Sequence, residues 1–96
     1  MNLHIVALFK VNESYMMEAV ELFQKLVRET RKEEGCLQYE LIEENEQKGT
    51  FFLIELWESV AHHNNHNGTD HLFEFRKNAS KILTESAQVY KGFKIY

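Results

Sequence analysis

Hydrophobic residues recur along this 96-residue chain at two spacings, one typical of strands and one typical of helices. The first segment, LHIVALFKV at residues 3–11, is apolar and β-branched and stops at the polar sequence NES, which predicts a strand. Residues 15–34 predict a helix of roughly five turns, with Ser14 as its cap and Gly35 as its end. One stripe of this helix is apolar and carries Met16, Ala19, Val20, Phe23, Leu26 and Val27.

A hairpin is predicted next, because residues 36–45 and 50–59 flank the turn sequence EQKG. The second of these strands is unusual because it is apolar on both faces. One face carries Phe51, Leu53 and Trp57, and the other carries Phe52, Ile54 and Leu56. Both faces of the sheet therefore need a cover.

The last third of the chain predicts a short helix that begins at Ser59, a break at Asn67-Gly68, and a second helical stretch from Asp70 to about Glu85. One side of this stretch is apolar and carries Leu72, Phe73, Ala79, Ile82 and Leu83. Residues 87–96 predict a closing strand. The order β-α-β-β-α-β predicts an α+β protein of the ferredoxin-like type, with one antiparallel sheet and its helices on one face.

Two helices can cover only one face of such a sheet, so the apolar second face needs another layer. In a chain of this length that layer has to come from a second copy. We therefore expect a homodimer packed sheet against sheet, which forms a dimeric α/β barrel. The alternative is a monomer with an exposed apolar sheet, which is disfavoured because large apolar patches on soluble proteins are rare.

Composition and charge narrow the possible functions. The chain is 44% hydrophobic and 27% charged, and its length suits a single domain over residues 1–96. A net charge of -4 with scattered Lys and Arg makes nucleic acid a poor partner. No apolar run approaches the roughly 20 residues of a membrane span, and the start does not resemble a secretory leader, so we expect no membrane association and a cytoplasmic protein. The single cysteine, Cys36, is expected to be a buried or half-buried strand residue.

The segment GCLQYELIEENEQKGTFFLIELWES, followed by His66 and then by HLFEF from residue 71, resembles the antibiotic biosynthesis monooxygenase domain. The likeness covers essentially the whole chain and implies a dimeric ferredoxin-like fold. Members of the family include quinol and polyketide-phenol oxygenases that need neither metal nor flavin, an isomerase that degrades a phosphorylated signalling sugar, and haem-degrading enzymes. The Asn, Trp and His of the haem-degrading members are matched here by Ala7, His66 and Arg76, so haem degradation is not expected.

Four of the five histidines lie in the stretch HHNNHNGTDH. His62 and His66 stand four residues apart, as in the metal-binding HExxH motif, but the Glu of that motif is missing. The nearby carboxylates, Glu58 and Asp70, lie at predicted helix ends. We therefore expect no metal, and we interpret His62 and His63 as part of a solvated helix end.

The resemblance makes His66 and His71 the candidate catalytic residues, because they occupy the two histidine positions of the family and flank the Asn67-Gly68 break. An imidazole with a pKa near ~6.5 can accept a phenolic proton at neutral pH and return it later. The implied mechanism needs no cofactor, since a deprotonated hydroquinone or anthrone can itself pass an electron to dioxygen. The alternative is that both rings hydrogen-bond the helix break and only shape the turn.

Five further residues are candidates for the substrate site. Trp57 could stack on a flat ring or belong to the core. Tyr39 and Glu55 are polar groups on otherwise apolar strands, so each belongs to a pocket or to an interface. Phe9 and Phe73 are expected in the core or the pocket lining.

Three functions are compatible with these features. The leading one is a cofactor-independent monooxygenase acting on a quinol, an anthrone or a related aromatic with dioxygen. The second is an isomerase or degradation enzyme for a small phosphorylated metabolite, which would need a cation such as Arg28, Arg76 or Lys77 in the pocket. The third is a non-catalytic dimer that binds a small molecule.

Overall fold

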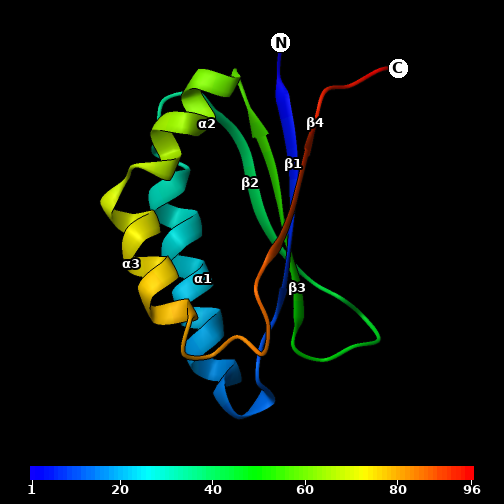
Figure 1. The fold of residues 1–96 in the computed structure, drawn as a ribbon, viewed down its shortest axis with the longest axis vertical. Helices are drawn as coiled ribbons and strands as arrows, with labels where there is room; N and C mark the ends of the chain where they lie inside the picture. Colours follow the sequence, from blue (N-terminus) through cyan, green and yellow to red (C-terminus); the bar gives the residue numbers. More distant parts are fainter.

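The computed structural model describes residues 1–96 and confirms the predicted ferredoxin-like fold (Figure 1). The elements in chain order are β1 (Leu3–Lys10), a single 3-10 turn (Glu13–Tyr15), α1 (Met16–Thr30), β2 (Cys36–Glu43), β3 (Thr50–Trp57), α2 (Val60–Asn67), α3 (Asp70–Ala79) and β4 (Gln88–Gly92). None of these helices is both long enough and apolar enough to cross a lipid bilayer.

The strands form one antiparallel sheet in the order β2-β3-β1-β4, and the helices lie together on one of its faces (Figure 1). The central strands β1 and β3 pair along their whole length, from Leu3 opposite Trp57 to Lys10 opposite Thr50. Their inward side chains are buried, whereas alternate residues point to the other face.

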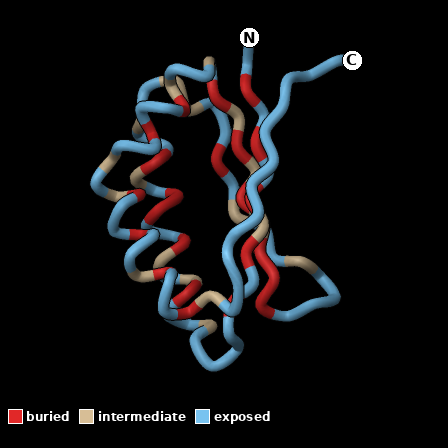
Figure 2. Tube along the Cα trace, viewed as in Figure 1, coloured by how far each residue is buried: buried red, intermediate tan, exposed pale blue.

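The core fills the space between this sheet and the helices, where the buried positions of both layers face one another (Figure 2). Its centre is a group of aromatic rings contributed by β1, α1, β3 and α3. The Phe23 ring lies 5.1 Å from Phe9, 5.4 Å from Phe51 and 5.2 Å from Phe75. These contacts hold α1 and α3 against the middle of the sheet.

The first helix differs from its predicted bounds at both ends. It is preceded by a 3-10 turn in which the Asn12 side chain, rather than Ser14, provides the cap by accepting from the Ser14 N–H. It ends at Thr30, and a turn follows before β2. Gly35 closes this turn with a φ of +83°, a conformation that glycine adopts without strain. The prediction of a stop at Gly35 was therefore right about the glycine and wrong about the length of the helix.

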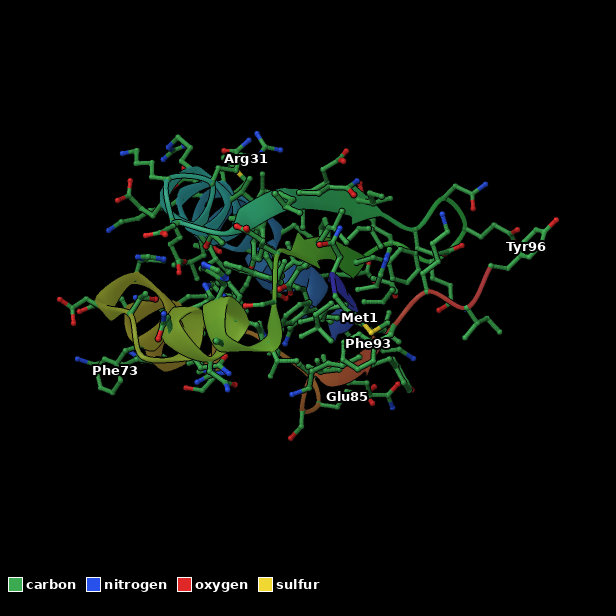
Figure 3. The ribbon with its side chains drawn as sticks, turned by 90° about the horizontal axis from the view of Figure 1, so that it is seen from above. Met1, Arg31, Phe73, Glu85, Phe93 and Tyr96 are labelled. Atoms are coloured by element: carbon green, nitrogen blue, oxygen red, sulfur yellow. The ribbon has the colours of Figure 1, made fainter.

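The last helix, α3, also ends earlier than predicted, at Ala79 rather than near Glu85. Its buried face carries Leu72, Phe75 and Ala79, spaced three and four residues apart. The prediction for Phe73 was wrong, because its side chain is 67% exposed and lies at the outer edge of the helix layer (Figure 3).

The second face of the sheet is apolar, as predicted, and no helix covers it. Ile54 and its neighbours Phe52 and Leu56 are half-buried, and Val6 and Tyr90 beside them are exposed. The closing strand β4 is shorter than the predicted 87–96, and all of its residues are exposed. The homodimer stays a prediction.

Candidate active site

A cavity of about 560 Å³ lies between the sheet and α3, in the size range of sites that bind small molecules. Eleven of its 21 lining residues are hydrophobic, including Phe9, Leu53 and Phe75. The lining also includes groups that carry a proton or a charge, namely the Tyr39 hydroxyl, Glu55, His63, His66, Arg76 and Lys91. The cavity thus combines apolar walls with a few groups that can transfer protons or carry charge.

Four of the seven predicted site residues line this cavity, namely His66, Tyr39, Glu55 and Phe9. His71 and Trp57 do not line it, and they lie behind His66 with ring centroids at 6.1 Å and 4.8 Å from its ring. Trp57 is fully buried, which favours the second of its two predicted roles, packing in the core. Phe73 lies outside the site altogether.

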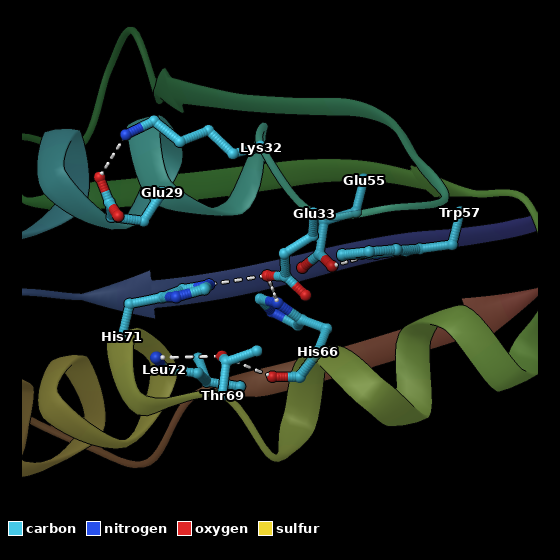
Figure 4. Close-up of polar contacts among 9 residues, drawn as sticks. All are labelled: Glu29, Lys32, Glu33, Glu55, Trp57, His66, Thr69, His71 and Leu72. Atoms are coloured by element: carbon cyan, nitrogen blue, oxygen red, sulfur yellow. Dashed lines mark hydrogen bonds and ion pairs between the residues drawn. The ribbon is translucent and has the colours of Figure 1, made fainter.

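His66 and His71 meet at Glu33, which the turn after α1 carries (Figure 4). The Glu33 Oε2 atom lies 2.6 Å from His66 Nδ1 and 2.7 Å from His71 Nε2. Because a carboxylate can only accept hydrogen bonds, both of these ring nitrogens are the protonated donors. The Nε2 of His66 is then the basic nitrogen of its ring, because the ring hydrogen bond to Glu33 uses Nδ1 and not Nε2.

Glu33 is the functional residue that sequence reasoning missed. It belongs to the charged run RKEE, and the adjacent Glu34 has a side chain that is 94% exposed. Nothing in the local pattern separates the two. Only the fold reveals the difference, because it brings Glu33 to histidines that follow 33 and 38 residues later.

The environment of His66 keeps its imidazole neutral. Only 2% of the residue is exposed, and its ring packs against Trp57 and against Tyr39, whose ring centroid lies 5.6 Å away. Burial lowers the pKa of His66, and the hydrogen bond to Glu33 opposes this shift. A neutral imidazole that is oriented by a carboxylate is a suitable general base.

His63 lies beside His66 rather than in solvent, so its interpretation as part of a solvated helix end was wrong. It is 7% exposed and lines the cavity. Burial lowers its pKa to about 4, with the nearby His66 acting in the same direction. His62, by contrast, contacts Ser59 Oγ at 2.7 Å through its Nδ1 and lies outside the cavity.

Glu55 and Tyr39 supply the other proton-carrying groups of the cavity. Glu55 Oε1 accepts a hydrogen bond of 2.9 Å from Trp57 Nε1 (Figure 4). Burial raises the pKa of Glu55 to about 7, so this carboxyl gains or loses its proton near neutral pH. Burial, aided by Glu55, also raises the pKa of Tyr39 well above its ordinary value, which keeps it a phenol.

The cluster Glu33, His66 and His71 could also hold a metal ion. Each residue offers one ligand atom, and these atoms lie within 4.8 Å of one another. Two histidines and one carboxylate are the ligands of many non-haem iron sites. The expectation of no metal considered the missing Glu of the HExxH motif and the nearby Glu58 and Asp70, and it overlooked Glu33. The separations of 2.6 and 2.7 Å are those of charge-assisted hydrogen bonds, so a metal would have to replace two ring protons.

The fold and the site together define a ferredoxin-like protein with a buried histidine beside a largely apolar cavity. The model of the antibiotic biosynthesis monooxygenase family matches residues 2–78, and the chain belongs to this family. YcnE of Bacillus subtilis, which is described only provisionally as a monooxygenase, is 32% identical over 85 residues, which cover 88% of this chain and 90% of YcnE. The family and this relative support a general monooxygenase-like role.

Solved structures agree with the fold. A conserved protein from Methanosarcina mazei Go1 superposes with a TM-score of 0.94 at 26% identity, over 98% of this chain and 93% of that one. Rv0793 from Mycobacterium tuberculosis gives a TM-score of 0.93 at 23% identity, over 100% of this chain and 97% of that one. The second likeness, at this identity, concerns the fold alone.

Proposed function

We propose that this protein is a cofactor-independent monooxygenase that oxidises a quinol, an anthrone or a related phenolic aromatic with dioxygen. The observation that carries the proposal is His66, which borders the cavity and is held by Glu33 through Nδ1, so that Nε2 is the basic nitrogen of its ring. The base, the orienting carboxylate and the apolar walls are what deprotonation of a phenol requires.

The reaction begins when His66 Nε2 accepts the phenolic proton of the substrate. The resulting phenolate passes one electron to dioxygen, and the substrate radical and superoxide combine to form a peroxide anion, which takes the proton of the imidazolium and becomes a hydroperoxide. The neutral imidazole then removes the hydrogen from the carbon that carries the hydroperoxide. The O–O bond breaks as the carbonyl of the quinone forms, and the departing hydroxide takes this second proton from the imidazolium and leaves as water. One oxygen atom thus enters the product and the other leaves as water.

The surrounding residues hold this base in place. Glu33 fixes the tautomer and the ring orientation of His66, and it binds His71 through the same oxygen. Trp57 and Tyr39 pack on the His66 ring. His71 is therefore proposed as a positioning residue rather than a second base.

Oxygen consumption tests the proposal. Chelator-treated, flavin-free protein is offered hydroquinones, naphthohydroquinones and anthrones, and His66→Gln is compared with His62→Gln, a change in the same helix outside the cavity. We expect enzyme-dependent uptake that falls by about 100-fold or more in His66→Gln and persists in His62→Gln. Uptake that disappears with the chelator and returns with added iron would instead support a metal centre at Glu33.

A second candidate function, an isomerase or degradation enzyme for a phosphorylated metabolite, is favoured by the presence of cations at the cavity. Of the three that were predicted, Arg76 lines it, whereas Arg28 and Lys77 do not. Lys91 on β4 lines it as well. Ligand depletion without oxygen uptake would favour this function, and binding without any turnover would favour a non-catalytic binder.

A further inference from the structure

Two cations reach the same cavity from opposite walls. Arg76 comes from α3 and Lys91 from β4, and both line the cavity while remaining exposed. They therefore lie at its solvent-facing edge. Neither takes part in any ion pair of the protein.

The acidic groups that line the cavity already have partners. Glu55 accepts from Trp57. Glu85, which also lines the cavity, lies 3.9 Å from Lys10. The edge of the cavity thus carries two unpaired positive charges in a chain whose net charge is -4. Such a local excess attracts anions in spite of the overall charge.

Both charges also act on the interior of the cavity. After burial, which is the largest cause, Lys91 and Arg76 each contribute to the lowered pKa of His63. Arg76 acts in the same way on His66, and Lys91 opposes the raised pKa of Glu55. Because both cations line the same cavity as His66 and Glu55, one small ligand can contact a cation and a proton-carrying group together.

We propose that Arg76 and Lys91 form an anion-binding subsite that selects substrates carrying a carboxylate or a phosphate. The guanidinium of Arg76 can bind two oxygens of such a group side by side, and the ammonium of Lys91 adds a point charge. The apolar part of the ligand then extends toward Phe9 and Phe75 in the cavity. The assignment of the reacting end to His66 rests on the proposed function, whereas the binding of the anion does not.

Matched ligands isolate the contribution of the anion. Calorimetric titration under anaerobic conditions compares 1,4-dihydroxy-2-naphthoate with 1,4-dihydroxynaphthalene, which differ only in the carboxylate, and ribose 5-phosphate with ribose. We expect the anionic member of at least one pair to bind 10- to 100-fold more tightly. Tighter binding of the anion in the first pair would show that the subsite binds a carboxylate, and tighter binding in the second pair would show that it binds a phosphate. Increasing salt should reduce the preference.

Variants then locate the subsite. Arg76→Gln and Lys91→Gln should each remove most of the preference, and the double variant should abolish it without changing the binding of a neutral ligand. Lys77→Gln, a neighbouring change on α3 outside the cavity, should keep it. The absence of any charge preference in both pairs, or a preference that survives in the double variant, would overturn the proposal. A preference without oxygen uptake would leave the subsite standing and remove the proposed monooxygenase activity.

Discussion

A single oxygen atom of Glu33 accepts hydrogen bonds from the ring N–H groups of two histidines. This arrangement determines which nitrogen of His66 is basic. In Glu33→Gln the side chain loses its charge and acquires an NH2 group that cannot accept from the imidazoles. We expect kcat to fall by about 10- to 100-fold, the range for losing the partner that orients a functional histidine. Steady-state oxygen uptake measures this effect, and Glu34→Gln is the matched control because its side chain is exposed.

The buried Glu55 carboxyl makes stability depend on pH. Its pKa is about 7 in the folded protein and near its ordinary 4.5 in the unfolded chain, so between these values only the folded state holds the proton. This contribution is therefore complete below about pH 4.5 and is lost as the pH rises through about 7. Glu55→Gln keeps an acceptor for Trp57 and removes the titration.

Urea unfolding of wild type and Glu55→Gln between pH 4.5 and 8 tests this dependence. Relative to wild type, the variant should gain roughly 3 kcal/mol of unfolding free energy across the range. The lowered pKa values of His63 and His66 act with the opposite sign, but both proteins share them, so the difference isolates Glu55. If the free energy of unfolding changed with pH in the same way in both proteins, the prediction would be contradicted.

Individual site residues could be predicted from the sequence where a polar residue interrupts an apolar pattern. Tyr39 and Glu55 were recognised in this way, and both line the cavity. Prediction from the sequence failed for Glu33, whose partners are distant in sequence, and for Phe73, which lies one position away from the buried spacing of α3. Three-dimensional contacts, rather than local pattern, decide such cases.

At the scale of elements, the approach of α2 to the turn before β2 depends on Gly35. A Cβ at this position would lie 2.3 Å from the His62 ring, and the φ of +83° disfavours any other residue. Gly35→Ala should therefore lower the free energy of unfolding by about 2 kcal/mol or more. Gly68→Ala, where the nearest atom is 3.6 Å away and φ is −98°, should change it by less than about 0.5 kcal/mol.

A double variant separates the two causes. Adding His62→Ala removes the ring that the new Cβ would meet. In thermal unfolding, Gly35→Ala should therefore lower the melting temperature less in the His62→Ala background than in the wild type. The cost of the backbone conformation should remain. A Gly35→Ala protein as stable as wild type would mean that α2 does not depend on this contact.

The order and type of the elements could be predicted from periodicity, but their ends could not. Residues after Ala79 continue the apolar spacing, yet they leave the helix to bond with the end of β1. The N–H of Asn12 donates to the Ile82 carbonyl at 2.8 Å, and the N–H of Thr84 donates to the Lys10 carbonyl at 2.9 Å. These long-range hydrogen bonds replace helical ones, and the local sequence pattern does not predict them.

At the scale of the whole molecule, the uncovered sheet face determines the expected assembly. Ile54 lies at its centre, between Val6 of β1 and Glu40 of β2. A second copy packed on this face would bury the apolar residues that the helices leave open, including Phe52 and Leu56. We therefore expect a particle of twice the 11.4 kDa chain mass.

Ile54→Asp tests this assembly, because a carboxylate at the centre of a dry interface has no partner and carries a large desolvation cost. In an isolated chain the same side chain would reach solvent, so the variant should fold as a monomer of 11.4 kDa. Sedimentation equilibrium at micromolar concentrations measures the mass, and circular dichroism verifies the fold. Met17 of α1 is 78% exposed and lies on the helix layer, so Met17→Asp should remain dimeric. A wild-type protein that sediments as a monomer would show that the apolar face is not a dimer interface.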